Sequence, residues 1–173
     1  MMRTRMMMAA VAALVIIVGG AIVGCSHRTP TEHDLFNVDA ALPAGLPVAP
    51  LEWRVITSSI DREHHTMATL FGNDAAVTSA RSAADAVTYP VAYGAGSRLA
   101  LVTWVQRDDE HWYGGRIPQR FVSMELVTVA AGADGKTATA YQRFGADGRL
   151  AGGSDQDAVR EEAILAKRAS FMP

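Results

Sequence analysis

Cysteine is almost absent from this sequence, because Cys25 is the only one among its 173 residues. A single thiol excludes an intramolecular disulfide, a metal centre built from several thiolates and the Cys-x-x-Cys-His motif that attaches c-type haem. A domain without disulfides depends on its apolar core. Residues 51–173 are long enough to form one domain with an adequate core.

The sequence also lacks an excess of basic charge. Lysine and arginine together number 16, against 18 aspartates and glutamates. A nucleic-acid partner would call for a clustered basic face, so we predict no nucleic-acid binding. No Gly-x-Ser-x-Gly motif of a serine hydrolase is present, and the glycine pairs lack the lysine of a phosphate-binding loop. We therefore predict no catalytic residues.

What the sequence does contain is a signal at its N-terminus. Two arginines precede an apolar run over residues 6–22, which is shorter than the roughly 20 apolar residues of a transmembrane helix. The run ends in Ile22-Val23-Gly24-Cys25, which resembles the lipobox cleaved by lipoprotein signal peptidase. The sequence predicts a signal peptide over residues 1–24 and lipidation of Cys25, which would anchor the chain to a membrane. The alternatives are an uncleaved anchor helix and an ordinary signal peptide.

The residue after the cysteine bears on location. In lipoproteins an aspartate at this position favours retention in the inner membrane, whereas this sequence has Ser26. By that resemblance we expect the chain to face the periplasm from the outer membrane.

Residues 25–50 are expected to form a tether between the lipid and the domain. This stretch is rich in proline and alanine, and proline disfavours regular structure. Fully extended, it would reach about 80 Å. Docking of Leu35 and Phe36 on the domain is the alternative to a solvated linker.

The remaining chain, residues 51–173, shows the patterns of an α+β domain. Alternating apolar residues, turn signals and an alanine-rich segment behind the capping residues Asn73 and Asp74 predict the order of elements. We expect an antiparallel sheet of about five strands with two packed helices. The strands are expected at residues 51–60, 66–71, 98–105, 121–129 and 137–144, and the helices at 75–84 and 156–169. Residues 106–119 are expected to form a polar connection.

Landmark residues along most of residues 51–144 resemble the cytochrome P-460 family. The most specific landmark is a Gly-Asn-Asp-Ala-Ala segment, followed by proline, glycine and tryptophan positions at the expected distances. The residues that carry the resemblance are Glu52-Trp53-Arg54-Val55-Ile56, Leu70-Phe71-Gly72-Asn73-Asp74-Ala75-Ala76, Tyr89-Pro90, Gly96-Ser97, Trp104 and Ser123-Met124-Glu125-Leu126-Val127.

This resemblance implies a periplasmic, sheet-rich domain that is often a homodimer. In its cytochrome members, a C-terminal Cys-x-x-Cys-His motif holds a c-type haem that oxidises hydroxylamine or handles nitric oxide, and the P-460 enzymes proper add a lysine cross-link. Here, residues 145–173 contain neither cysteine nor histidine. The only lysines are Lys136 and Lys167, whereas loose alignment places the family's lysine near Leu101. We therefore expect a relative without bound cofactor.

The five histidines are the remaining candidates for holding a metal or non-covalent haem. His27 and His33 lie in the expected tether, His64 and His65 in a polar turn, and His111 in a loop. Adjacent residues of an extended chain point to opposite faces, so the pair offers one ligand more readily than two. We expect solvated loop histidines and no metal site.

A pocket is the other candidate site, centred on Glu125. This residue lies in the middle of a predicted strand, and the alternation of side chains would place Phe121, Ser123, Val127 and Val129 on its face. Either Glu125 points into a pocket as a buried acid, or it lies near solvent and pairs with Arg143. If Glu125 points into a pocket, the three tryptophans Trp53, Trp104 and Trp112 would form its walls.

Together these patterns predict a lipid-anchored envelope protein whose domain binds a small ligand or a protein partner. The alternative function is redox chemistry with non-covalent haem or a metal, held through His64, His65 or His111.

Overall fold

The computed structural model describes residues 36–132 and 135–170. The chain divides into two units, Met1–Phe36 and Asn37–Pro173. The predicted signal peptide, Cys25, His27 and His33 lie outside the described residues, as does the rest of the expected tether up to residue 35. Within the described ranges, no helix is long and apolar enough to cross a membrane.

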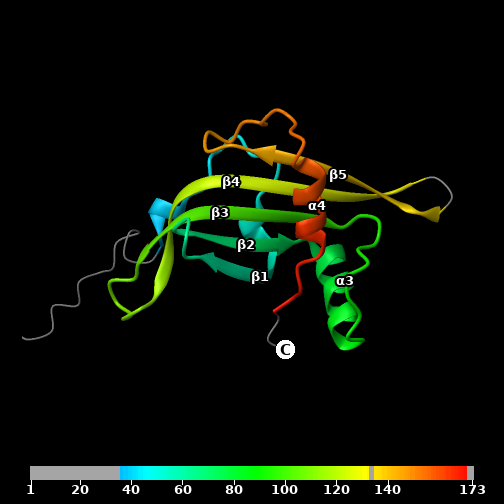
Figure 1. Ribbon diagram of the computed structural model, residues 1–173, viewed down its shortest axis with the longest axis horizontal. Helices are drawn as coiled ribbons and strands as arrows, with labels where there is room; N and C mark the ends of the chain where they lie inside the picture. Colours follow the sequence, from blue (N-terminus) through cyan, green and yellow to red (C-terminus); the bar gives the residue numbers. More distant parts are fainter. Residues whose placement is uncertain (1–35, 133–134, 171–173) are drawn as a thin grey trace, which may run out of the picture. The chain divides into compact units, whose positions relative to one another are not determined.

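The second unit is built on a five-stranded antiparallel sheet, whose strands follow one another in sequence order (Figure 1). This arrangement and two α-helices confirm the predicted α+β class. The strands are β1 (Arg54–Asp61), β2 (Thr66–Gly72), β3 (Arg98–Asp108), β4 (Arg116–Ala131) and β5 (Thr137–Phe144). The helices are α3 (Asp74–Asp85) and α4 (Asp157–Leu165), with two short 3-10 helices, η1 (Val38–Ala40) and η2 (Pro50–Glu52).

Asn73 fixes the start of α3, as its sequence predicted. Its side-chain oxygen accepts hydrogen bonds from the backbone N–H of Ala76 at 3.1 Å and of Arg98 at 3.0 Å. One side chain thus caps the helix and ties it to the first residue of β3. The preceding Gly72 allows close packing, because a Cβ there would lie 2.6 Å from the Ile56 side chain.

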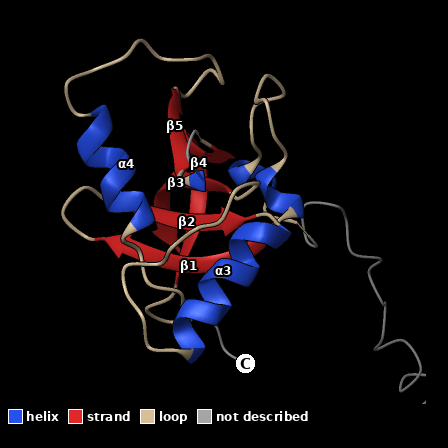
Figure 2. Ribbon diagram, turned by 90° about the vertical axis from the view of Figure 1, so that its right-hand side faces the viewer, coloured by secondary structure: helices blue, strands red, loops and turns tan. Residues whose placement is uncertain are grey.

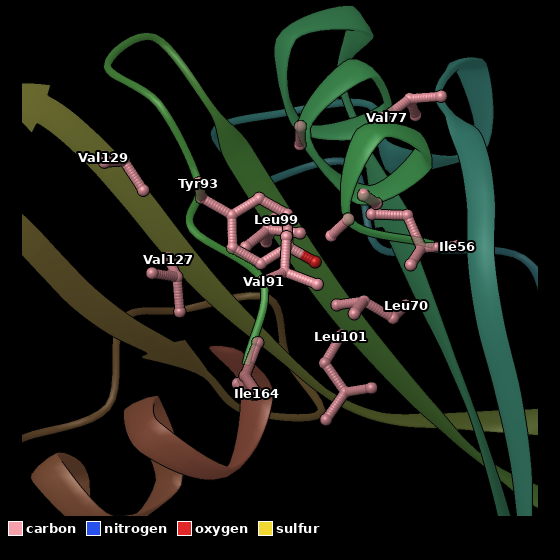
Figure 3. Close-up of a cluster of buried hydrophobic side chains, with 13 residues drawn as sticks. Ile56, Leu70, Val77, Val91, Tyr93, Leu99, Leu101, Val127, Val129 and Ile164 are labelled. Atoms are coloured by element: carbon pink, nitrogen blue, oxygen red, sulfur yellow. The ribbon is translucent and has the colours of Figure 1, made fainter. Parts of the chain in front are cut away.

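One face of the sheet carries a core shared with both helices. Figure 3 shows side chains of the sheet meeting Val77 of α3, Ile164 of α4 and Val91 and Tyr93 of the loop before β3. We call this the helix face. Its buried sheet residues are Ile56, Leu70, Leu99, Leu101, Val127 and Val129.

The other face of the sheet is equally apolar and is covered by residues 37–53, which we call the wrap. Ala40, Leu42, Leu46, Val48 and Trp53 of the wrap pack against a second buried cluster. Figure 2 shows α4 and the short helices of the wrap on opposite sides of the strands. The cluster on this wrap face comprises Phe71, Ala100, Val102, Trp104, Phe121, Met124, Leu126 and Phe144.

The wrap corrects the expected tether. The prediction placed the start of the domain at Leu51, whereas the compact unit begins at Asn37. The physical cause is the alternation along β3 and β4, which directs apolar side chains to both faces and leaves a second face that must be kept from water. The indole N–H of Trp104 donates to the carbonyl of Ala40 at 3.0 Å and holds the wrap in place.

Three element boundaries also differ from the sequence prediction. Strands β3 and β4 run on into residues 106–119, which were expected to form a polar connection, and only residues 109–115 remain as their loop. The last helix ends at Leu165, and the chain continues to Ser170, whose N–H donates to the Ile56 carbonyl of β1 at 2.9 Å. In β4, a register shift moves Phe121 to the wrap face, opposite to the face predicted for it.

Candidate functional site

Glu125 is the one buried carboxylate among the described residues, with 2% of its surface exposed. It lies on the helix face in the middle of β4, and three hydrogen bonds reach it. Arg160 of α4 donates from Nε to Oε1 at 2.8 Å and from Nη2 to Oε2. Tyr141 of β5 donates its hydroxyl to Oε1 at 2.5 Å.

The structure thus decides between the two readings of Glu125. The residue is buried, as the pocket reading required, but its oxygens are occupied by partners. Arg143 stands directly opposite Glu125 in the β4–β5 register, yet the ion pair of Glu125 is with Arg160. The cluster of Glu125, Tyr141 and Arg160 binds α4 to the sheet.

Electrostatics in this cluster favour the ion pair. Hydrogen bonds to the Glu125 carboxylate raise the pKa of Arg160 above its usual value. Burial, followed by the hydrogen bond to Glu125, raises the pKa of Tyr141 well above that of a free tyrosine. Tyr141 is therefore a neutral donor and Arg160 a permanent cation at neutral pH. This arrangement suits structural pairing more than acid–base chemistry, for which a group must exchange its proton.

Sequence reasoning missed Arg160 and Tyr141 as the partners of Glu125. The sequence carries a signal for each of these two residues. Arg160 lies four residues before the buried Ile164, so both are on one side of α4. Tyr141 lies two residues from Arg143 and shares its face of β5. Which helix face meets which strand depends on the tertiary fold, so neither signal identifies the pair alone.

The four residues predicted to line a pocket do not meet. Glu125 lies on the helix face, whereas Trp104 is buried on the wrap face and Trp53 packs against the same wrap-face cluster, with Arg98 over its ring. The sheet itself separates the acid from these two rings. Trp112 lies in the loop between β3 and β4 with 74% of its surface exposed. The predicted pocket of Glu125, Trp53, Trp104 and Trp112 is therefore wrong as one site.

The described histidines lie in turns, two of them paired with acids. His64 Nδ1 lies 2.8 Å from Asp61 Oδ2, and a hydrogen bond from the His64 backbone lowers the pKa of Asp61. His111 is 94% exposed and lies beside Asp109. Within the part of the chain that the structure describes, no group of three or more histidine, cysteine or acidic residues is placed to hold a metal ion.

The residues after β5 do not fit a covalently attached c-type haem, because they include neither cysteine nor histidine.

An apolar cleft in the wrap is the best candidate for a ligand site. It has a volume of about 600 Å³, within the usual range of small-molecule sites. Residues 41–44 and 46–52 line it, and these are alanine, leucine, proline and valine apart from Glu52. The sequence did not reveal this cleft, because the same composition is typical of a solvated linker.

A buried tyrosine on the helix face is the second unusual polar group. Tyr93 is 6% exposed and lies among Leu99, Val91 and other apolar side chains (Figure 3). Its hydroxyl has no hydrogen-bond partner among the described residues. Burial raises the pKa of Tyr93 to about 12.

No family model matches this chain, and no match was found among curated proteins.

Removing the cation of the buried cluster tests its structural role. We expect Arg160→Ala to lower the free energy of unfolding by about 2–3 kcal/mol, because Glu125 keeps its burial but loses its counter-ion, while half of Arg160 is already solvated. The double variant Glu125→Leu/Arg160→Leu should recover to within about 1 kcal/mol of the parent. Urea denaturation measures both. The exposed Glu162→Ala on the same helix is the control, and equal effects of Arg160→Ala and Glu162→Ala would contradict the assignment.

The buried hydroxyl of Tyr93 predicts a loss of stability at alkaline pH. Since its folded pKa of about 12 lies above the unfolded value near 10, stability is fully present below pH 10 and falls as the pH rises toward 12. By pH 11 we expect the parent to have lost about 1 kcal/mol more stability than Tyr93→Phe, and the variant to be no less stable than the parent at pH 7. Denaturation curves from pH 7 to 11 measure this. Parallel curves for the parent and Tyr93→Phe would refute it, and the exposed Tyr113→Phe serves as the control.

Proposed function

We propose that this chain is a lipid-anchored protein of the cell envelope whose domain binds a small apolar or amphipathic ligand in the cleft of the wrap. The apolar cleft of about 600 Å³ carries the proposal for the domain. The lipobox-like segment ending in Cys25 supports the anchor and, with Ser26, a place on the periplasmic face of the outer membrane.

The start of the domain at Asn37 shortens the spacer behind the proposed lipid. Only residues 26–36 separate Cys25 from the compact unit, instead of the whole predicted tether. At full extension these residues reach about 40 Å. The domain would therefore work close to the membrane surface, where amphipathic molecules are concentrated.

The lining of the cleft restricts the chemistry of its ligand. Its alanine, leucine, proline and valine side chains suit an aliphatic body, which gains free energy by leaving water. Glu52 supplies the only charge, and its side chain is exposed. A neutral or cationic head group would be tolerated beside Glu52, whereas an anionic one would be repelled weakly.

We further propose that the domain is a haem-free relative of the cytochrome P-460 family. The landmark residues of the resemblance have defined structural roles: Asn73 caps α3, Gly72 allows its close approach to Ile56, and Trp104 fastens the wrap. Residues with such roles are the ones that a shared fold would retain.

Intact-mass spectrometry of the mature protein tests the anchor. We expect a protein that begins at Cys25 and carries two or three acyl chains, because processing at a lipobox includes both cleavage before the cysteine and its lipidation. An unmodified cysteine, or a chain that still begins at Met1, would overturn the anchor. A Soret band with stoichiometric haem in the same preparation would favour the redox alternative over ligand binding.

Native mass spectrometry of the same protein tests the cleft, with decylamine and decanoate as probes. We expect decylamine to bind with one equivalent, and two- to fivefold more tightly than decanoate, as about 0.5–1 kcal/mol of charge interaction implies. Leu51→Lys places a charge in the cleft at an exposed position and should weaken binding about tenfold. Val159→Lys, at a similarly exposed position on α4, is the matched control. Absence of binding, or equal loss in both variants, would refute the proposal.

A further inference from the structure

The loop between β3 and β4 carries an exposed aromatic pair. It covers residues 109–115, and we call it the β3–β4 tip. Trp112 is 74% exposed, and the neighbouring Tyr113 is fully exposed. Gly114, with a φ of 76°, and Gly115 follow and let the chain turn back into β4. Neighbouring exposed aromatic side chains form contiguous apolar surface, which is the kind of surface that marks interaction sites.

Trp and Tyr together are typical of one kind of environment. Their rings are apolar, but their N–H and O–H groups still require hydrogen bonds. The interfacial region of a lipid bilayer satisfies both needs, and these two residues are enriched there. Ile60 of β1, which is half exposed and lines a hollow with Gly114 and Gly115, adds apolar surface beside the tip.

The charges around the tip are largely paired within the protein. Arg116 pairs with Asp108, Arg107 lies 3.5 Å from Glu110, and His111 lies 3.6 Å from Asp109. Residues 107–116 carry two arginines and three acids, and Arg62, which lines the hollow beside the tip, brings the formal balance of this region to zero. The tip therefore has no net positive charge that would attract anionic lipid or an acidic protein. Its distinctive chemistry is aromatic.

The N-terminal end of the compact unit lies at the base of the same hairpin. Asn37 donates its side-chain N–H to the Pro118 carbonyl of β4 at 2.5 Å, and Asp39 lies 4.0 Å from Arg107 of β3. Figure 1 shows η1 at the end of the sheet beyond which the β3–β4 tip extends. Because residues 26–36 span at most about 40 Å, a lipid on Cys25 would bring a bilayer within reach of this end of the domain.

We propose that Trp112 and Tyr113 insert into the interfacial region of the membrane to which Cys25 is anchored. This inference rests on the proposed lipidation of Cys25. The lipid holds the domain at a high local concentration near the surface, so a weak aromatic contact is enough to keep the tip on the bilayer. The domain then has a fixed orientation, with the sheet end that carries η1 and the tip toward the lipid.

Tryptophan fluorescence of the mature lipoprotein in phosphatidylcholine vesicles tests this orientation. Vesicles that contain brominated phosphatidylcholine quench an indole that lies among the lipids. We expect the emission assigned to Trp112 to fall by more than about twofold, with no change on adding salt, because the tip charges are paired. Trp112→Phe should remove the quenched component. Trp53→Phe is the matched control and should leave it, since Trp53 packs against the wrap-face cluster.

Intact mass of the same samples separates the possible failures. Lipidated protein whose Trp112 is unquenched by brominated lipid overturns this inference and leaves the anchor standing. Unlipidated protein overturns both. If Trp112 is shielded from iodide as well as from brominated lipid, and the protein has the mass of a dimer, the tip is an interface between two copies, and the inference is again overturned.

Discussion

A sheet that is apolar on both faces is the constraint from which the rest of this structure follows. Leu99 and Leu101 point to the helix face, while Ala100 and Val102, which alternate with them along β3, point to the wrap face. The two helices can cover only one side. The other side would expose a large apolar surface to water without the wrap, and exposure of that kind costs roughly 25 cal/mol for each Å². The wrap is therefore part of the domain and not a linker to it.

The sequence predicted the elements whose signals are local and missed those that depend on distant contacts. Alternation in the strands, the cap at Asn73 and the alanine-rich α3 each lie within one short segment, and the α+β sheet was predicted from them. The wrap has no periodic pattern of apolar residues. Leu42, Leu46 and Val48 lie among prolines, and their burial depends on contacts with the sheet, which is distant in sequence. The partners of Glu125 are similarly remote, since Arg160 lies 35 residues away.

The wrap connects the fold with the proposed function. Its inner side chains complete the second core, its prolines and alanines form the apolar cleft, and its first residue contacts the β3–β4 hairpin. Because the wrap belongs to the domain, the spacer behind Cys25 is short and the aromatic tip lies near the proposed membrane. The cluster of Glu125, Tyr141 and Arg160 plays a separate part on the opposite face, where it holds α4 in place.

Hydrogen exchange of the Trp104 indole N–H, followed by NMR, tests most directly whether the wrap covers the sheet. This N–H donates to the carbonyl of Ala40, so it can exchange only when the wrap opens. The exposed indole of Trp112 provides an unprotected reference in the same spectrum. The account predicts that Trp104 exchanges at least about a hundredfold more slowly than Trp112, as an opening free energy near 3 kcal/mol implies. Equal exchange rates for the two indoles, with the sheet amides still protected, would contradict it.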